Sequence, residues 1–363
     1  MHASLQSLPQ TSDGPAPGPA HRIQRILVSR LRFLGDVLLT TPVVRRLREV
    51  FPAAEIVYLT EAAYAPLLAH NPHLDEVLAF APQAPLTAQA HFYRSLRRRR
   101  FDLVIDLFGN PRTALLSWIT GAPVRVGGDF RGRGKLYSHR VPPPNGDPDA
   151  ITFHLRSLEI LGIAPGDRRT EVFLVPEERL WAQSFLAMQA IDPARPLVGM
   201  HPGASWPNKR WPASHFAEVA QALLQAEVQV ILTQGPQEGP IVTAVKQQAP
   251  GVKVLPVLSL RETAAVLARC SAFVSNDCGI LHLAVAVGTP TVGLFGPSQK
   301  EIWFPYAATH GHLALDFTIA CRPCHQNVCP LQHLDCQKQL LPPRVLAAVW
   351  QALKQRPPAE RAA

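Results

Sequence analysis

A single carboxylate follows a glycine near the start of the chain, in the stretch LRFLGDVLLTTP at residues 31–42. Asp36 stands there between an apolar run typical of a strand and an apolar run typical of a helix. A carboxylate at this point can cap the helix by accepting backbone N–H groups, or it can act as a general base on a bound hydroxyl. The residues alone leave both roles open.

A second stretch, HPGASWPNKRWP at residues 201–212, carries two adjacent cations. It follows the apolar run PLVGM, so Gly203 would lie at the end of a strand, where the lack of a side chain lets the backbone approach a ligand. Lys209 and Arg210 could bind a phosphate group. The alternative is a surface loop that its two tryptophans hold in place.

A third stretch, SNDCGILHLAVAVG at residues 275–288, passes from a strand pattern into a helix pattern. The first N–H groups of that helix and the positive end of its dipole would suit a pyrophosphate. In the alternative interpretation, Asp277 only caps the helix and His282 only faces a neighbouring element. GTPTVGLFGPS at residues 288–298 ends in a second turn at the same edge, and two such turns favour a nucleotide site.

Glu238 ends the turn GPQE at residues 235–238, directly after the strand pattern VQVILT. Its carboxylate could accept a hydrogen bond from a ribose hydroxyl. It could instead be an acid at the start of a helix, where negative charge is favoured.

Four of the six cysteines fall within the segment CRPCHQNVCPLQHLDC at residues 321–336. The gaps between them are two, four and six residues, with His325 and His333 interspersed. Four sulfur or nitrogen ligands could hold a structural zinc ion, although one short segment must curl tightly to present them. Reduced thiols in a packed loop, or a redox or iron–sulfur role, are the open alternatives.

Alternating strands and helices must position these stretches. In the first half, strand patterns at 23–30, 55–60 and 101–109 alternate with helix patterns at 36–52 and 62–72. Within the helix pattern at 36–52, apolar residues recur at steps of one, three and four. The run VIDLF lacks polar alternation, as expected of a parallel strand buried on both faces. The first half therefore predicts an α/β domain.

The second half repeats this alternation and predicts a second doubly wound sheet. We expect two Rossmann-like domains facing each other across a cleft, with ligands beyond the carboxyl ends of the strands. Residues 121–150 lose all periodicity and predict a long irregular loop, and the turn VPEE puts the domain boundary near Pro176. The expected units are a disordered leader at 1–22, a first domain at 23–175, a second domain at 176–343 that includes the cysteine segment, and a C-terminal helix at 344–355.

Composition narrows the class of protein. A chain of 363 residues exceeds the roughly 250 to 300 residues beyond which single cores split. No window approaches the roughly 18 consecutive apolar residues of a transmembrane helix, and the leader lacks the apolar stretch of a signal peptide, so the cytoplasm is the expected location. The net charge of +9 and the run RSLRRRR at 94–100 favour an anionic partner, or the run is a solvated helix end.

Missing motifs weigh against other classes. Neither GxGxxG nor GxxxxGK[ST] occurs, which weakens a nicotinamide oxidoreductase and a P-loop protein. The arginine run at 94–100 lacks interleaved aromatic residues, so we expect no nucleic-acid partner.

Taken together and in this order, the stretches resemble glycosyltransferase family 9, the bacterial heptosyltransferases that build the inner core of lipopolysaccharide. The similarity spans roughly residues 24–355. It rests on LGDVLLTTPVVRRLREVFP near the start, on HPGAS followed by KRWP at mid-chain, and on SNDCGILHLAVAVGTPTVGLFGPS. The cysteine segment followed by a final helix looks most like the heptosyltransferase II branch.

The resemblance implies a GT-B fold in which the first domain binds mainly the acceptor and the second binds the nucleotide sugar. It also implies that a heptose moves from ADP-L-glycero-D-manno-heptose with inversion, without a metal or other cofactor. By position, Asp36 matches the family's proposed general base. The residues implied in donor binding are Ser205, Lys209, Arg210, Glu238, Asp277, Cys278, Gly279 and His282, with Glu238 the least secure match.

Cys278 departs from the family pattern, because many members carry Thr or Ser after the aspartate. A thiol is a weaker hydrogen-bond partner than a hydroxyl. The contact to phosphate that we expect to survive at this position is the one from the backbone N–H.

The expected acceptor is a phosphorylated glycolipid, reached by peripheral contact with the inner face of the cytoplasmic membrane. The arginine-rich segments 94–100 and 125–140 would suit its negative charge. The resemblance does not fix the acceptor, and another nucleotide sugar or another acceptor within the family is the alternative.

Overall fold

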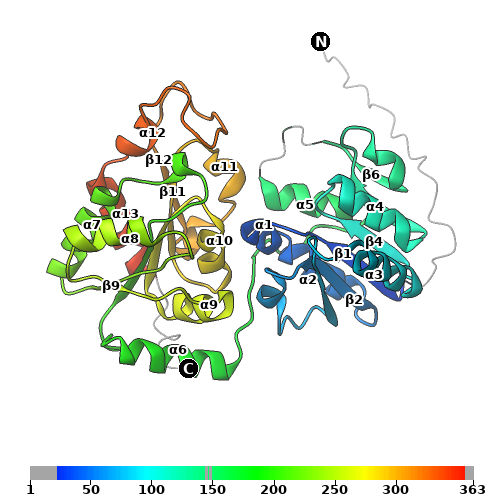
Figure 1. The fold of residues 1–363 in the computed structure, drawn as a ribbon, viewed down its shortest axis with the longest axis horizontal. Coiled ribbons are helices and arrows are strands. Elements are labelled where there is room, and N and C mark those ends of the chain that lie inside the picture. The colour runs from blue at the N-terminus through cyan, green and yellow to red at the C-terminus, as the bar shows by residue number, and fades with distance from the viewer. Residues whose placement is uncertain (1–22, 144–145, 147–148, 356–363) are drawn as a thin grey trace, which may run out of the picture.

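The computed structural model describes residues 23–143, 146 and 149–355. The leader expected at residues 1–22 lies outside these ranges. Within them the strands form two six-stranded sheets, and each sheet has helices on both faces. Figure 1 shows the two halves side by side.

The first sheet has the strand order β3-β2-β1-β4-β5-β6, and all neighbouring strands are parallel. Its strands are β1 (Arg25–Ser29), β2 (Glu55–Glu61), β3 (Glu76–Phe80), β4 (Leu103–Asp106), β5 (Val124–Gly128) and β6 (His139–Val141). The helices around it are α1 (Leu34–Leu39), α2 (Thr41–Val50), α3 (Leu86–Arg98), α4 (Pro111–Thr120) and α5 (Ala150–Glu159), with short 3-10 turns η1 (Ala65–Leu68) and η2 (Arg133–Leu136).

The second sheet repeats this order as β12-β11-β10-β7-β8-β9. Its strands are β7 (Leu197–His201), β8 (Gln229–Leu232), β9 (Lys253–Val254), β10 (Ala272–Asn276), β11 (Thr291–Phe295) and β12 (Leu313–Asp316). The helices are α6 (Pro176–Met188), α7 (Ala213–Gln225), α8 (Gly239–Gln248), α9 (Leu260–Arg269), α10 (Gly279–Ala286), α11 (Lys300–Trp303), α12 (Asp335–Lys338) and α13 (Pro342–Lys354), with η3 (Pro207–Lys209) and η4 (Ala308–His310). The prediction of two doubly wound α/β sheets is confirmed.

Central strands are apolar throughout because both sheet faces are covered. The residues of β4, β7, β10 and β11 are all buried. This explains why runs such as VIDLF carry no polar alternation.

One helix was expected over 36–52, but the chain breaks there into α1 and α2 at Thr40. Pro42 has no N–H to donate to the carbonyl of Leu38, and the hydroxyl of Thr41 donates to that oxygen instead, at 2.8 Å.

The prediction of a long irregular loop over 121–150 is wrong. Strands β5 and β6 lie within these residues and pair in parallel with the rest of the sheet. Two glycines that read as breakers belong to β5. A Cβ at Gly127 would lie 2.3 Å from the ring of Tyr137, and a Cβ at Gly128 would lie 2.1 Å from the ring of Phe130. These glycines make room for aromatic rings.

The final helix, α13, begins two positions before the predicted residue 344 and packs against α7 and the second sheet. Helix α6 begins at Pro176, where the VPEE turn was read, and packs against α9. The domain limits themselves stay a prediction. No helix of the described ranges is long and apolar enough to cross a membrane.

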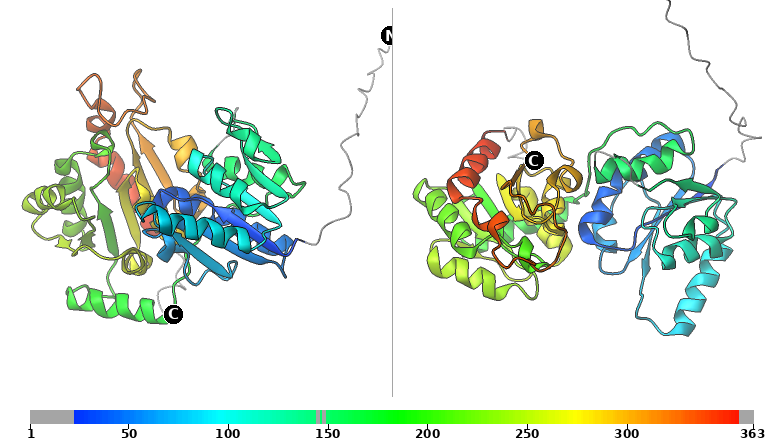
Figure 2. Two further views of the ribbon diagram at one scale, coloured as in Figure 1. Left: turned by 45° about the vertical axis from the view of Figure 1, so that its right-hand side comes forward. Right: turned by 90° about the horizontal axis from the view of Figure 1, so that it is seen from above.

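The two halves meet where α1 packs against α10. The view from above in Figure 2 shows the two lobes side by side. The contact depends on two glycines. A Cβ at Gly35 would lie 2.5 Å from Cδ2 of His282, and a Cβ at Gly279 would lie 2.9 Å from Cβ of Leu34. Leu38 of α1 and Leu283 of α10 continue the contact as one buried apolar cluster.

We predict that Gly279→Ala lowers the free energy of unfolding by about 1–3 kcal/mol, the usual cost of overpacking, because the new methyl group meets Leu34. Gly239→Ala is the matched control. Gly239 is likewise the first residue of a helix, and the nearest neighbour of its Cβ would be 4.0 Å away. Urea denaturation of both variants would measure the difference, and equal midpoints would contradict the close approach of α1 and α10.

Candidate active site

The candidate site lies at the carboxyl ends of the strands where the strand order of each sheet reverses. These switch points fall between β1 and β4 in the first sheet and between β7 and β10 in the second. Open α/β sheets bind ligands at such points. The contact of α1 with α10 brings the two switch points together.

Asp36 is held by two donors. It is the third residue of α1, and its Oδ2 accepts the backbone N–H of Phe33 at 3.0 Å. Its Oδ1 lies 2.7 Å from a guanidinium nitrogen of Arg30. Since a carboxylate offers about four acceptor positions, capping the helix leaves lone pairs for another proton. The two roles considered from the sequence are therefore compatible.

Two contacts hold the Arg30 side chain in place. It donates to the carbonyl of Leu107 at 2.8 Å and stacks over the ring of Phe108, with 4.6 Å between the guanidinium carbon and the ring centroid. Both contacts come from the chain that follows β4. The position of Asp36 is thus set by the two strands at the switch point.

Asp277 does not cap α10, because the cap residue is Cys278. The Asp277 carboxylate instead pairs with Nζ of Lys209 at 2.6 Å and accepts the hydroxyl of Ser298. Lys209 also lies 4.8 Å from the ring centroid of Trp206. The three stretches at 201–212, 275–288 and 288–298 therefore meet around the Lys209–Asp277 pair.

Asn276 ties two of these turns together. Its side chain accepts the N–H of Trp211 at 3.0 Å and donates to the carbonyl of Pro202 at 2.8 Å. Sequence reasoning did not assign this role, because an asparagine at a strand end is equally compatible with a simple turn. The predicted anchor Trp211 is fully buried.

The other two predicted residues of the 201–212 turn differ in their contacts. Arg210 donates from Nε to the carbonyl of Ala204 at 2.8 Å, and its charge lies near Glu238. Ser205 is exposed at the tip of the turn.

His201, Glu238 and Cys278 form a cluster that the sequence did not reveal. His201 ends β7 and is buried, with Nε2 3.3 Å from Oε2 of Glu238 and Nδ1 3.0 Å from the hydroxyl of Thr233. Cys278 lies near the same ring, and its sulfur is 3.4 Å from the hydroxyl of Ser275. The only sequence signal was a histidine directly after the apolar run PLVGM.

Glu238 is the residue preceding α8, where an acid had been one alternative. Its Oε2 accepts the N–H of Gly235 at 2.6 Å as well as facing His201. Burial raises the pKa of Glu238, but His201 and the N–H of Gly235 outweigh it and hold the pKa below its usual range.

His282 lies at the centre of the site. Its Nδ1 is 2.7 Å from the hydroxyl of Tyr306, and its ring covers Gly35. Burial lowers the pKa of His282, while the charges of Asp277 and Asp36 act in the opposite direction. The buried ring of His282 therefore contacts α1 and lies near an acidic residue of each half, Asp36 and Asp277.

A cavity of ≈ 160 Å³ opens beside Arg30 at the carboxyl end of the first sheet. Asp106, Phe130 and His154 are among its lining residues. Burial and the charge of Arg30 lower the pKa of His154 to about 3, so its ring is neutral, and its Nδ1 has no partner within the described part of the protein. This cavity can take a polar ligand next to Arg30, the partner of Asp36, and the sequence did not predict it.

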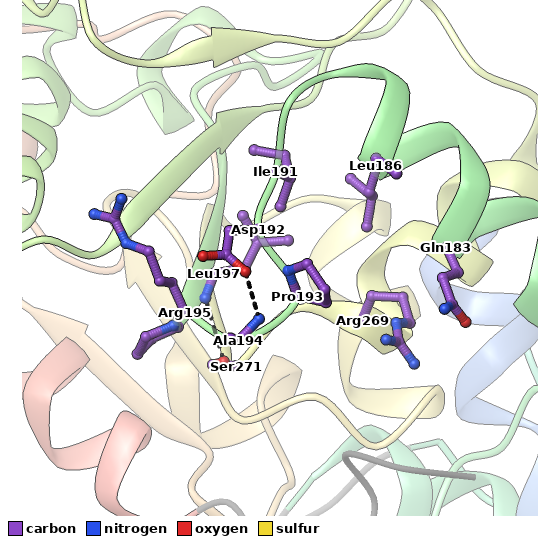
Figure 3. A pocket seen from close by; sticks show the side chains of 12 residues that line it. Gln183, Leu186, Ile191, Asp192, Pro193, Ala194, Arg195, Leu197, Arg269 and Ser271 are labelled. Carbon is purple, nitrogen blue, oxygen red and sulfur yellow. Dashed lines mark hydrogen bonds between the residues drawn. The ribbon is translucent and has the colours of Figure 1, made fainter.

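Another cavity, of ≈ 230 Å³, lies elsewhere (Figure 3). It is bounded by the end of α6, by Asp192 and Arg195 before β7, and by Arg269 and Ser271 before β10. These residues lie at the amino ends of the strands. The cavity is therefore on the opposite edge of the sheet from Lys209 and Asp277.

The arginine run at 94–100 also lies away from the site. Arg99 pairs with Glu76, the first residue of β3, and Arg97 donates to the carbonyl of Ile119. The run ends before β4 begins, at the amino edge of the first sheet. In the second arginine-rich segment, Arg133 does reach the carboxyl edge, where it donates to the carbonyl of Gly109.

The cysteine segment packs over the turn that carries Lys209. Gln337 donates to the carbonyl of Lys209 at 2.7 Å, and the N–H of Cys324 donates to the carbonyl of Pro297 at 3.1 Å. The four cysteines and His333 line one small cavity. Among residues 23–143, 146 and 149–355, no group of three or more His, Cys, Asp or Glu side chains is arranged to hold a metal ion.

Comparison with known proteins shows the family and the fold. The sequence model of glycosyltransferase family 9 (heptosyltransferase) matches residues 89–335. Lipopolysaccharide heptosyltransferase 2 of Escherichia coli strain K12 is 30% identical over 302 residues, covering 77% of this chain and 85% of that protein.

Solved structures share the fold. A glycosyl transferase family 9 protein from Veillonella parvula is 25% identical, with a TM-score of 0.82 over 92% of this chain and 98% of that one. A heptosyltransferase of Escherichia coli with ADP-2-deoxy-2-fluoro heptose is 22% identical, with a TM-score of 0.66 over 92% and 99% of the two chains. The predicted GT-B fold is confirmed.

Proposed function

Because the chain belongs to glycosyltransferase family 9, we propose that it transfers a heptose from ADP-L-glycero-D-manno-heptose to the inner core of lipopolysaccharide. Two relatives support the donor and the product: one is a lipopolysaccharide heptosyltransferase, and one is a structure with an ADP-heptose analogue. The observation that carries the proposal is the convergence on His282 of Asp36 from one half and Asp277 with Lys209 from the other.

The second half would bind the donor. The start of α10 offers unpaired N–H groups and the positive end of a helix dipole to the diphosphate. Lys209, kept in place by Asp277, adds a positive charge at the same edge. Arg210 lies on the same turn. These groups, and not a metal ion, would stabilise the negative charge that grows on the departing ADP.

The first half would bind the acceptor and supply the base. The acceptor hydroxyl gives its proton to Asp36 as its oxygen bonds to the anomeric carbon. The bond from that carbon to the phosphate oxygen breaks, and its electron pair leaves with ADP. One displacement inverts the anomeric centre. The cavity beside Arg30 would hold the acceptor sugar, and exclusion of water from the interface would protect the donor from hydrolysis.

We predict that Asp36→Asn lowers kcat by about 10²–10⁴-fold, the usual contribution of a general base, while calorimetry shows donor binding close to that of wild type. The amide cannot take the proton, but it can still accept the N–H of Phe33. Turnover is measured as ADP released from ADP-heptose with a heptose-bearing or Kdo-bearing lipid A acceptor.

Asp75→Asn is the matched control, because Asp75 also accepts one backbone N–H, from Ile56, and one arginine, Arg48. It lies before β3, at the amino edge of the sheet. Near-normal turnover of Asp36→Asn, or an equal loss in Asp75→Asn, would show that Asp36 is not the base.

Another nucleotide sugar within the family is the second candidate, and a binding panel separates the two. We predict that calorimetry shows tighter binding of ADP than of UDP or GDP, and that Lys209→Met weakens ADP binding by at least about tenfold. Lys246→Met is the control, because the Lys246 ammonium donates to the backbone carbonyls of Pro250 and Val252. Tighter binding of UDP or GDP would replace the ADP-heptose assignment.

We also propose that the protein works peripherally at the inner face of the cytoplasmic membrane, where a phosphorylated glycolipid acceptor would be found. The support is a surface on α4. Trp118 and Leu115 are 55% and 44% exposed there, and Arg97 of the neighbouring α3 reaches the end of α4. Apolar and cationic groups side by side suit an anionic lipid surface.

We predict that the double variant Leu115→Ser/Trp118→Ser binds vesicles of phosphatidylcholine with phosphatidylglycerol several-fold more weakly than wild type in co-sedimentation, since it loses the apolar contact. Leu180→Ser/Met188→Ser is the control, because both residues are exposed on α6. If the two variants sediment alike, α4 is not the membrane contact.

A further inference from the structure

Two residues that line the cavity beside Arg30 each carry a buried polar atom without a partner. The lining includes Arg30, Asp106, Phe108, Phe130, Phe153 and His154. Nδ1 of His154 and Nε of Arg30 are buried and make no hydrogen bond to any residue that the structure describes. Buried polar groups nearly always have a partner. Two such atoms on residues of one cavity therefore point to a ligand that supplies the missing hydrogen bonds.

His154 determines which chemical group the cavity can recognise. The residue belongs to α5 and is 5% exposed. Burial and the charge of Arg30 lower the pKa of His154 to about 3, so its ring is neutral at physiological pH. A neutral imidazole has one N–H donor and one nitrogen acceptor. A hydroxyl group matches either nitrogen, because it can both donate and accept a hydrogen bond.

The charges around the cavity disfavour an anionic ligand. The cation of the lining is Arg30, and its guanidinium already pairs with Asp36 at 2.7 Å. Asp106 is 4% exposed, and its carboxylate accepts the hydroxyl of Tyr137 at 2.6 Å and the N–H of Phe108 at 3.0 Å. A carboxylate or phosphate in this cavity would compete with Asp36 for Arg30 and would lie near the fixed negative charge of Asp106.

Phenylalanine rings supply the apolar walls. The ring centroids of Phe130 and Phe153 are 6.3 Å apart, with 43° between the ring planes. Phe108 lies under the guanidinium of Arg30. Gly128 makes room for this wall, because a Cβ there would lie 2.1 Å from the Phe130 ring. Aromatic walls with a few polar groups are typical of small-ligand sites, and a sugar ring presents C–H groups to such walls and hydroxyls to the polar groups.

The volume of the cavity limits the ligand to a single ring. It measures ≈ 160 Å³, and one water molecule occupies about 30 Å³ in the liquid. The space is therefore equivalent to a handful of water molecules, which suits one six-membered sugar ring better than a disaccharide.

We propose that this cavity binds one sugar ring of the acceptor that carries neither a carboxylate nor a phosphate, and that His154 selects this ring through a hydrogen bond to a hydroxyl group. The proposal rests on the proposed function, because it takes the ligand of the first half as the acceptor. Arg30 lines the cavity and also pairs with Asp36, so the bound ring lies beside the arginine that holds the base. The phosphate groups of the glycolipid lie outside the cavity.

The first measurement is the steady-state kinetics of His154→Leu at saturating ADP-heptose, with the concentration of a heptose-bearing lipid A acceptor varied. We expect the acceptor KM to rise at least about tenfold and kcat to stay within about threefold, because the lost hydrogen bond contributes equally to ground state and transition state. ADP binding by calorimetry should not change. The Tm should not fall, since an apolar side chain of similar size replaces an unpartnered buried polar group.

Two further variants separate binding from folding. His154→Asn keeps a hydrogen-bonding group near the place of Nδ1, and its acceptor KM should lie closer to that of wild type. His312→Leu is the matched control, because His312 is also buried, burial and His310 lower its pKa to about 4, and its Nδ1 has no partner among the described residues. His312 directly precedes β12, at the amino edge of the second sheet. This variant should leave the acceptor KM unchanged.

The second measurement does not need turnover. It is saturation-transfer difference NMR of the protein with either of two methyl glycosides, that of L-glycero-D-manno-heptose, which is uncharged, and that of Kdo, which is a sugar acid. We expect saturation of the heptoside, strongest at its ring C–H protons, and little saturation of the Kdo glycoside. The heptoside signal should decrease in His154→Leu and persist in His312→Leu.

The outcomes separate this proposal from the proposed function. An unchanged acceptor KM in His154→Leu, an equal rise in His312→Leu, or a loss confined to kcat overturns the role of His154 even if the enzyme transfers heptose normally. Equal or stronger saturation of the Kdo glycoside, or no saturation of the heptoside in wild type, overturns the uncharged ring. Heptoside binding that depends on His154, without release of ADP from ADP-heptose, supports the sugar site and contradicts the proposed function.

Discussion

The close approach of α1 and α10 is the contact on which the site depends. Neither helix could start where it does if Gly35 or Gly279 carried a side chain, because His282 and Leu34 fill the space. Each glycine stands beside the residue that matters chemically, Asp36 in one half and Cys278 with Asp277 in the other. The same contact therefore joins the halves and brings their switch points together.

Paired charges keep the reacting groups in place. Asp36 pairs with Arg30, Lys209 pairs with Asp277, and His201 faces Glu238. Partly buried charges cost free energy unless they are paired and hydrogen-bonded. The pairs Lys209–Asp277 and His201–Glu238 join residues from different turns, whereas Arg30 and Asp36 lie on either side of the one turn between β1 and α1. Each turn thereby orients a group on its neighbour, and a ligand that enters the cleft meets side chains that are already positioned.

Much of this arrangement follows from the sequence. Apolar runs without polar alternation predicted buried parallel strands, and the turns that carry Asp36, Lys209 and Asp277 were predicted to meet at the strand ends. The break at Thr40 was missed although Pro42 marks it, because the apolar period continues across it. Strand β5 was missed because glycines that accommodate aromatic rings resemble glycines that end a strand.

Other features had no local signal. His201 gains its role from Glu238 and Cys278, which lie far along the chain and meet it only in the folded sheet. The cavity beside Arg30 depends in the same way on Phe130 and His154, and periodicity cannot show which side chains share a cavity.

A crystal structure of the protein with ADP-2-deoxy-2-fluoro heptose would test the central claim most directly. The account predicts that the diphosphate lies at the start of α10, within hydrogen-bond distance of Lys209, with the anomeric carbon facing Asp36 across the interface between the halves. The nucleotide in the cavity between Asp192 and Arg269, or a sugar turned away from Asp36, would contradict it.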